Sequence, residues 1–366
     1  MTWRRALVLA TVVVLAVGTG AVVPGAVAAQ DDCTFPVTAT DATGTDVTLD
    51  EEPEEIVVTG ASAAQTVWEL GEEDRVVGMP VGPGQGTDTL DGADDRTHVL
   101  EGVHVDAEQI VDLDPDLVIA PGITAEEDVE ELRDLGLTVY YEGDAESIAD
   151  VQENVRTTGD LIGACEAADE TVEWMDETLD RVDEAVEDED RPTVYYWLGE
   201  GFTAPAGSFQ HDLLERAGAR NAAANMTMDG WALSDEEQIV EEDPEYLLLQ
   251  EGDDVPDSEA IQATTAVQED NVIVVDRNDW NQDAPRVVLA VEQIAEQLHP
   301  AAFEATDAPT DDATTDAADD ATTGATDDTA ATDDDAADDA DGTPGFGLVA
   351  AVLALSAVAS ALVRRQ

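Results

Sequence analysis

The Gly-Ala-Ser run at residues 60–62 comes nearest to a catalytic motif, because it directly follows a predicted strand at residues 56–58. A nucleophile elbow needs glycine two positions after the serine, but Ala64 stands there. The glycines of residues 78–86 do not form a dinucleotide-binding fingerprint either, since no helix N-terminus directly follows them. The sequence therefore predicts no catalytic residues and a protein that is not an enzyme.

Metal ligands are scarce as well. The chain has four His. His98 and His104 could lie together, but no cysteine cluster and no His-x-x-x-His motif accompanies them, so they fit loop positions better. We predict no metal site and no cofactor.

Three aromatic residues stand in polar loops bounded by glycine, although Phe, Trp and Tyr make up only 4% of the chain: Phe202, Trp231 and Trp280. One interpretation is that they are plugs that pack loops onto the domains. The other is that they line a cleft for a bulky, partly apolar ligand. Loops at the carboxyl ends of parallel strands are where open α/β sheets bind ligands, which favours the second interpretation and predicts that Trp231 and Trp280 face each other across the cleft.

One short pattern occurs twice with the same spacing. A Glu-Gln-Ile-Val run that begins at Glu108 leads through Asp-Pro into the apolar residues 117–120, and a second run from Glu237 leads through Asp-Pro into residues 246–249. Each copy predicts a short helix that begins with a carboxylate, a turn at Asp-Pro, and a buried parallel strand. The agreement in order and spacing indicates two related lobes.

Between the two copies, residues 144–189 keep an apolar spacing of three to four, with Asp and Glu on the other faces. This pattern predicts a long helix that acts as a strut, which Gly159 and Gly163 could bend or split. Strands alternate with short helices on both sides of it. The predicted fold is α/β: two Rossmann-like three-layer lobes with parallel sheets, joined by one long rigid helix.

The N-terminus has the features of a secretory signal: arginines at positions 4 and 5, an apolar run at residues 6–17, and a small-residue cleavage site at residues 26–28. An uncleaved anchor is the alternative. Export places Cys33 and Cys165 in an oxidising compartment, so we expect a disulfide, with two separate buried thiols as the alternative. Export also makes Asn225-Met226-Thr227 a candidate N-glycosylation sequon, although a glycan there could crowd a cleft near Trp231.

The 366 residues carry a net charge of −72, with 14 arginines and no lysine. Nucleic acid is excluded as a partner, because phosphate binding needs clustered cations. Such acidity keeps a protein soluble at multi-molar salt and indicates adaptation to an extremely saline environment.

Composition and pattern changes set the predicted domain boundaries. Residues 304–343 consist almost wholly of Ala, Asp and Thr and cannot bury a core, so they predict an extended linker. The apolar run at residues 347–363 is at the short end for a membrane span, with arginines after it. The predicted parts are a signal peptide (1–28), an N-terminal lobe (29–143), the connecting helix (144–190), a C-terminal lobe (191–303), the linker (304–343) and a membrane-anchoring end (344–366).

The span from Cys33 to Leu298 resembles the substrate-binding proteins of ABC importers for cobalamin, ferric siderophores and haem. The resemblance implies two α/β lobes on one rigid helix and a ligand held between them. It rests on six segments: residues 55–58, 70–78, 114–119, 207–209, 218–221 and 243–244.

The family docks on its permease through one glutamate in each lobe, and these match Glu108 and Glu237. The resemblance also implies a ligand site, although the chain lacks the aromatic residues that cobalamin binders carry in the first lobe, around residues 80–86 and Pro121. The ligand-binding residues that we predict are Ser62, Met79, Phe202, Trp231, Trp280 and Arg286.

The C-terminal end resembles the sorting signal of archaeal surface proteins, in which Pro344, Gly345 and Phe346 follow an acidic stalk and precede an apolar helix. This resemblance implies an archaeosortase-like processing enzyme and a membrane lipid anchor. A plain membrane helix is the alternative.

The predicted function is the extracellular, membrane-tethered binding component of an ABC importer that delivers a corrinoid to a permease and its ATPase. A ferric siderophore or haem is the second ligand, a zinc or manganese carrier is a further alternative, and a stalked surface hydrolase is the most distant one.

Overall fold

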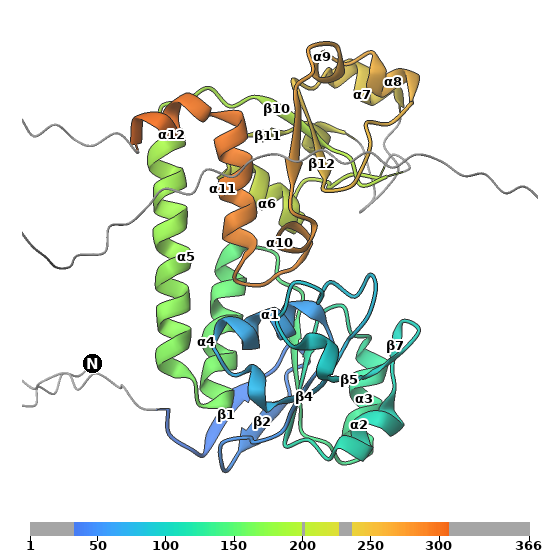
Figure 1. Ribbon diagram of the computed structural model, residues 1–366, viewed down its shortest axis with the longest axis vertical. Helices are drawn as coiled ribbons and strands as arrows, with labels where there is room; N and C mark the ends of the chain where they lie inside the picture. Colours follow the sequence, from blue (N-terminus) through green and yellow to red (C-terminus); the bar gives the residue numbers. More distant parts are fainter. Residues whose placement is uncertain (1–32, 200–201, 227–235, 307–366) are drawn as a thin grey trace, which may run out of the picture. The chain divides into compact units, whose positions relative to one another are not determined.

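Two parallel β-sheets form the centres of two lobes in the computed structural model, which describes residues 33–199, 202–226 and 236–306 (Figure 1). In the first lobe an antiparallel hairpin, β1 (Val37–Thr40) and β2 (Asp46–Leu49), precedes a five-stranded sheet in the order β5-β4-β3-β8-β9. The sheet consists of β3 (Ile56–Val58), β4 (Val76–Met79), β5 (Thr97–His98), β8 (Leu117–Pro121) and β9 (Val139–Gly143). The segments that connect these strands form the helices α1 (Ala61–Glu69), α2 (Ala107–Leu113) and α3 (Glu126–Asp134) and the 3-10 turns η1 (Glu73–Arg75) and η2 (Ala93–Asp95). They also form a small hairpin of β6 (Leu100–Glu101) and β7 (His104–Val105).

The second lobe has a four-stranded parallel sheet in the order β11-β10-β12-β13. Its elements are β10 (Thr193–Tyr196), α6 (Phe209–Arg216), β11 (Arg220–Asn221), η3 (Ala222–Asn225), α7 (Glu236–Glu242), β12 (Tyr246–Gln250), α8 (Glu259–Gln262), α9 (Thr265–Gln268), β13 (Val272–Val275), α10 (Arg277–Asn281), α11 (Val287–Leu298) and α12 (Pro300–Thr306).

The predicted internal repeat is present in the topology. The strand order β4-β3-β8-β9 of the first lobe matches β11-β10-β12-β13 of the second, because the first strand of each sheet, β3 or β10, lies between the strand that follows it and the strand after the Asp-Pro turn. The Asp-Pro turns also match, since Asp114 (φ 50°) and Asp243 (φ 42°) both adopt the left-handed conformation. The acidic residue after each proline makes an equivalent contact in both lobes. Asp116 accepts a hydrogen bond from the amide of Glu54, just before β3 (2.8 Å), and Glu245 accepts one from the amide of Thr193, the first residue of β10 (2.9 Å).

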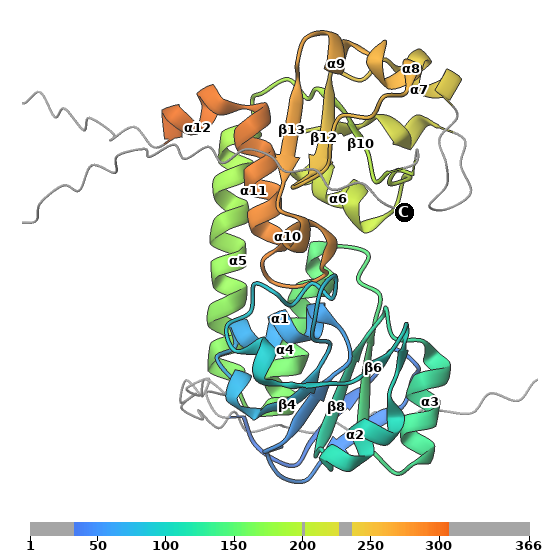
Figure 2. The ribbon, with the colours of Figure 1, turned by 45° about the vertical axis from the view of Figure 1, so that its right-hand side comes forward.

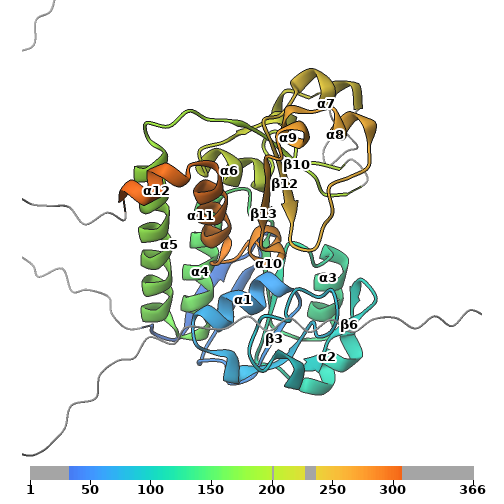
Figure 3. The same ribbon diagram turned by 45° about the horizontal axis from the view of Figure 1, so that its top comes forward.

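The predicted strut is not one long helix: it is split at Gly163, one of the two glycines expected to bend or split it, into a helical hairpin. The chain forms α4 (Ile148–Ile162), turns at Gly163 and Ala164, and returns as α5 (Cys165–Val186), and the two helices lie side by side (Figures 2 and 3). Gly163 ends α4 with φ 78°, which favours glycine. A Cβ atom on Gly159 would lie 2.4 Å from the Cβ of Ala168, so glycine is required where the helices meet. At about 1.5 Å per residue, α5 alone is about 33 Å long and provides the rigid connection.

The core has three layers, as predicted. In β3 the side chains alternate: Ile56 and Val58 join a large cluster with α1, α4 and α5, whereas Val57 faces the α2 and α3 side. In β10, Tyr196 joins the same large cluster and Tyr195 faces α7 and α8. One continuous apolar cluster therefore includes residues of both lobes and of the hairpin between them.

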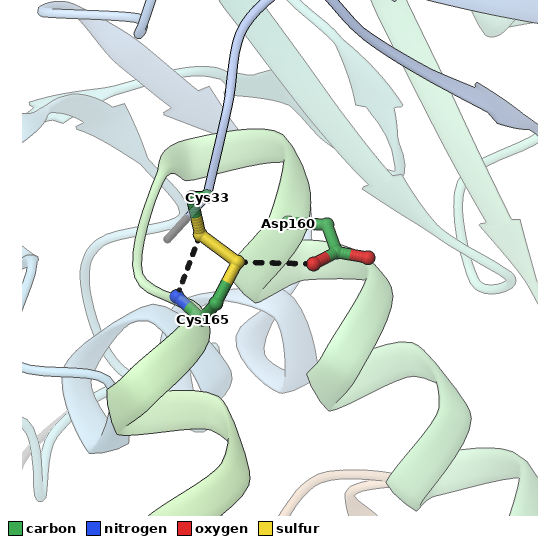
Figure 4. Close-up of side chains that lie close together, drawn as sticks. All are labelled: Cys33, Asp160 and Cys165. Atoms are coloured by element: carbon green, nitrogen blue, oxygen red, sulfur yellow. Dashed lines mark hydrogen bonds between the residues drawn. A yellow bond between two sulfur atoms is a disulfide. The ribbon is translucent and has the colours of Figure 1, made fainter. Parts of the chain in front are cut away.

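The predicted disulfide between Cys33 and Cys165 is present, with a Cα–Cα distance of 5.8 Å (Figure 4). The Cys165 amide donates to the Cys33 sulfur over 3.0 Å, and Asp160 lies beside the bond. The two cysteines are 132 residues apart, and closing a loop of that length stabilises the fold by about 4–5 kcal/mol in the chain-entropy view. The bond fastens the N-terminal segment to the first residue of α5.

The signal at 1–28, the acidic linker after Thr306 and the apolar run at 347–363 lie outside the described residues. Among the helices of the described ranges, none is long and apolar enough to cross a membrane.

Candidate functional site

The carboxyl ends of the two sheets meet at a cavity of about 790 Å³. The first lobe contributes the loop at residues 82–89, which follows β4, and Ile123, which follows β8. The second lobe contributes Glu251 after β12 and the segment from Asp276 to Asn278 after β13. Because ligands of open parallel sheets bind outside the carboxyl ends of the strands, this cavity is the candidate binding cleft.

A second hollow of about 340 Å³ adjoins the cleft and belongs to the first lobe. The two share Ala61, Gly84, Gln85 and Ile123. Two aliphatic side chains of the adjoining hollow are strongly exposed, Val103 at 87% and Ile123 at 84%. The first lobe thus offers an aliphatic wall where the sequence showed no aromatic residues. A sequence signal existed for Ile123, because it lies just past the Pro121-Gly122 end of a buried apolar run.

A close backbone approach builds this wall. A Cβ atom on Gly60 would lie 2.4 Å from Cγ of Pro121 and 3.2 Å from a methyl group of Ile123. Only glycine therefore allows the loop after β3 to pack against the loop after β8. The hydroxyl groups of Thr59 and Thr124 hydrogen bond over 2.7 Å behind it and tie the same two loops together.

Of the predicted aromatic residues, Phe202 is 36% exposed and lies in the loop after β10. Its backbone exchanges hydrogen bonds with Gly199 and Leu198 over 2.9 Å in each case. This loop leaves the second sheet at its carboxyl edge, the edge that lines the cleft. Trp231 lies outside the described residues, so its predicted position opposite Trp280 stays a prediction.

The structure places Trp280 in the core rather than in the cleft. Its ring is 0% exposed and packs edge-on against Tyr196, with ring centroids 5.3 Å apart. The apparent loop is the short helix α10, which Asp276 caps by accepting from the amides of Asn278 and Asp279. A ring without exposed surface cannot stack on a ligand in this conformation, so Trp280 is a plug. Met79 is likewise 0% exposed and belongs to the core of the first lobe.

Ser62 and Arg286 take part in contacts between the lobes instead of lining the cleft. On α1, Gln65 accepts from the Arg286 amide (2.9 Å) and donates to the Gln282 side chain (2.9 Å). Arg286 also pairs with Glu69 over 2.6 Å. We call Gln65, Glu69, Gln282 and Arg286 the interlobe latch. Ser62 hydrogen bonds Asp283 beside it. The guanidinium group of Arg286 is thus engaged by α1.

Two carboxyl groups face each other across this contact. Burial, and then the negative charge of Asp283, raise the pKa of Glu142 to about 7, while a hydrogen bond from Thr158 of α4 opposes the shift. Burial also raises the pKa of Asp283, opposed by hydrogen bonds from Ser62 and the Ala145 amide, and Asp144 adds to the increase. The lobe contact therefore favours the protonated form of Glu142.

We expect Glu142→Gln to remove part of the pH dependence of stability. The folded chain binds this proton more tightly than the unfolded chain, whose glutamate titrates at about 4.3. Stability is therefore lost as pH rises from there through about 7. The amide variant should be about 1–2 kcal/mol more stable than the parent at pH 8, and the gain should shrink toward pH 5. Denaturant unfolding at both pH values checks this, with the exposed Glu130→Gln as control. An equal effect of both substitutions would contradict it.

The remaining predicted residues lie on the surface. Glu108 and Glu237 are exposed on α2 and α7, each in the first turn of its helix. Asn225 is exposed at the end of η3, where its amide donates to Glu242 over 3.3 Å, and its glycosylation stays a prediction. His98 and His104 do not pair: His98 accepts from the Val81 amide (2.9 Å), and His104 contacts Asp128 (3.2 Å).

Two α/β lobes with facing carboxyl edges, a cleft between them and a rigid helical connection define a two-lobed substrate-binding protein. Residues 56–278 match the periplasmic binding protein family, and the chain belongs to that family. It is thus a binding protein and not an enzyme, as predicted. Residues 343–366 match the PGF-CTERM motif, which anchors the chain at the cell surface through its C-terminus.

Relatives of known class agree with this assignment. The chain is 38% identical to the cobalamin-binding protein of Halobacterium salinarum over 310 residues, which cover 80% of this chain and 83% of the relative. It is 29% identical to an uncharacterised ABC transporter substrate-binding lipoprotein, YvrC of Bacillus subtilis, covering 82% and 97%. The vitamin B12 binding protein BtuF of Vibrio cholerae has the same fold, with a TM-score of 0.60, 22% identity, and coverage of 68% and 98%.

Proposed function

We propose that this surface-anchored protein binds a corrinoid in the cleft and delivers it to an ABC permease. The observation that carries the proposal is the cleft itself, a cavity of about 790 Å³ joined to an aliphatic wall at Ile123 and Val103. A cavity of that volume is within the range of small-molecule binding sites. The 38% identical cobalamin-binding relative supports the same ligand class.

The chemistry of the lining favours a corrinoid over an anionic chelate. A corrinoid presents an apolar macrocycle edged with neutral amides, and the cleft offers amide side chains from Gln85, Asn278, Asn281 and Gln282. Acidic side chains also line it, at Asp88, Asp94, Glu251 and Asp276. Arg277, the cation of the lining, pairs with Asp253 over 2.7 Å.

Among the described residues, such a lining offers no unpaired cation to the propionates of haem or to a negatively charged ferric siderophore. These ligands are the second candidate because a solved haem-binding protein, HmuT, shares the fold, with a TM-score of 0.61 and 23% identity.

Equilibrium dialysis at multi-molar salt tests the ligand, with cobalamin, cobinamide, haem, a ferric siderophore and zinc as separate probes. We expect retention of the corrinoids. In a second arm, Ile123→Asp should weaken corrinoid binding by about 1–3 kcal/mol, because it places a charge on the aliphatic wall. Leu135→Asp is the control, since Leu135 is 54% exposed at the end of α3 and lines neither hollow. Tighter retention of haem than of cobalamin would refute the corrinoid proposal.

Substrate-binding proteins of this family work with a permease and its ATPase. We propose that Glu108 and Glu237 pair with cations on the two halves of the permease, which is supported by their exposure and their equivalent positions in the repeat.

We also propose that an archaeosortase-like enzyme removes the end of the chain after the Pro-Gly-Phe motif and that a lipid then holds it.

A further inference from the structure

The two lobes repeat not only a sequence but also a pattern of exposure. From Glu108 to Asp116 the residues are exposed, intermediate, buried, exposed, exposed, intermediate, exposed, buried and exposed, and the nine residues from Glu237 to Glu245 follow the same order. The isoleucine of each copy is buried under its helix, Ile110 at 0% and Ile239 at 1%. The valine that follows it points outward in both lobes.

Both valines belong to the small set of eight large apolar side chains that the described residues expose. Val111 is 40% exposed and Val240 is 49% exposed. Each lies three positions after the glutamate of its copy, so Glu108 and Val111 share one face of α2, and Glu237 and Val240 share one face of α7. A buried isoleucine, an exposed valine and an exposed glutamate thus recur together in both lobes.

We propose that Val111 and Val240 are contact residues for the permease and that each packs into an apolar recess beside the cation that receives the neighbouring glutamate. This inference rests on the proposed function, because it takes Glu108 and Glu237 as docking residues. We call Glu108 with Val111, and Glu237 with Val240, the docking patches.

Two observations favour the permease as the partner of the docking patches. Two equivalent patches on one chain fit a partner that presents two equivalent surfaces, as a two-halved permease does. A second copy of the chain does not fit, because each patch is acidic, with Asp112 or Glu241 next to its valine, and the chain carries a net charge of −72. The partner surface must therefore offer cations around an apolar recess.

High salt affects the glutamates and the valines of the docking patches differently. At 1 M ionic strength the screening length falls to about 3 Å, so exposed ion pairs lose most of their strength. Burial of apolar surface is not screened. The valines would therefore supply the part of docking that persists at high salt, whereas the glutamates orient the chain.

The test measures binding of the full chain to the purified permease–ATPase complex in lipid nanodiscs, at low and at multi-molar salt. Val111→Thr with Val240→Thr keeps the side-chain shape and replaces one methyl group of each valine by a hydroxyl group. We expect this double variant to bind at least 10-fold more weakly at high salt, with corrinoid affinity and melting temperature unchanged. Val274→Thr is the matched control, because Val274 is 38% exposed on β13, outside both patches.

Glu108→Gln with Glu237→Gln separates this inference from the proposed function. We expect that variant to lose productive docking at both salt concentrations, because the glutamates orient the chain, with the larger loss of affinity at low salt. If the glutamine variant docks poorly and the threonine variant docks like the parent at high salt, the valine inference is overturned while the docking glutamates stand. If both variants dock like the parent, the docking surface itself is wrong.

Discussion

Alanine at both Glu108 and Glu237 should abolish corrinoid uptake while ligand affinity and fold persist. Both side chains are exposed, so their removal leaves no cavity and no buried unpaired group. A purely structural role exists for comparison, because a carboxylate in the first turn of a helix gains about 0.3–1 kcal/mol from the helix dipole. That role predicts a small loss of stability and normal uptake.

Uptake of labelled cobalamin by cells that carry each variant decides between these roles. The control is Glu126→Ala with Glu127→Ala, because these residues are also exposed in the first turn of a helix, α3. The control should lose a similar amount of stability and retain transport. Normal uptake by the Glu108 and Glu237 double variant would remove the docking proposal.

Trp280→Ala should lower the free energy of unfolding by about 3–5 kcal/mol, because it deletes a fully buried indole. The cavity would open beside Tyr196, in the cluster shared by both lobes. Corrinoid affinity of the remaining folded protein should change little. Thermal unfolding without ligand, followed by titration well below the melting temperature, measures both quantities.

Phe202→Ala is the comparison, since Phe202 is partly exposed at the carboxyl edge of the second sheet. There we expect a small change in melting temperature and weaker ligand binding. The opposite outcome, in which Trp280→Ala melts like the parent but fails to bind, would return Trp280 to the ligand site.

The sequence was most informative where local pattern and burial agree. Alternation and apolar runs located β3, β8 and β12, and the Asp-Pro spacing showed the repeat, because backbone geometry at these steps depends on nearby residues. The same logic predicted one long strut that Gly159 and Gly163 could bend or split, and the chain is divided at Gly163. The apolar spacing continues across Gly163 because α4 and α5 both bury one face, and a two-residue turn hardly interrupts the pattern.

The site was less predictable, because its residues meet only in three dimensions. The interlobe latch joins Gln65 to Gln282 across 217 positions, and nothing local to either glutamine indicates its partner. Trp280 was misplaced because its polar neighbours suggested a loop, whereas Asp276 caps a short helix that turns the ring inward. Ile123 was missed because its signal is its position just past the end of β8 and not a periodic pattern, which a lone aliphatic residue in a loop cannot have.

Helix α5 has a mechanical consequence for a tethered protein. Its first residue carries the disulfide to Cys33, and α12 packs beside its far end, where the described chain stops on its way to the anchoring motif (Figure 1). Both ends of the described chain are thus fixed to helix α5 rather than to a sheet. A pull on a C-terminal tether would therefore enter the folded part through α12 and α5 rather than through the sheets that line the cleft.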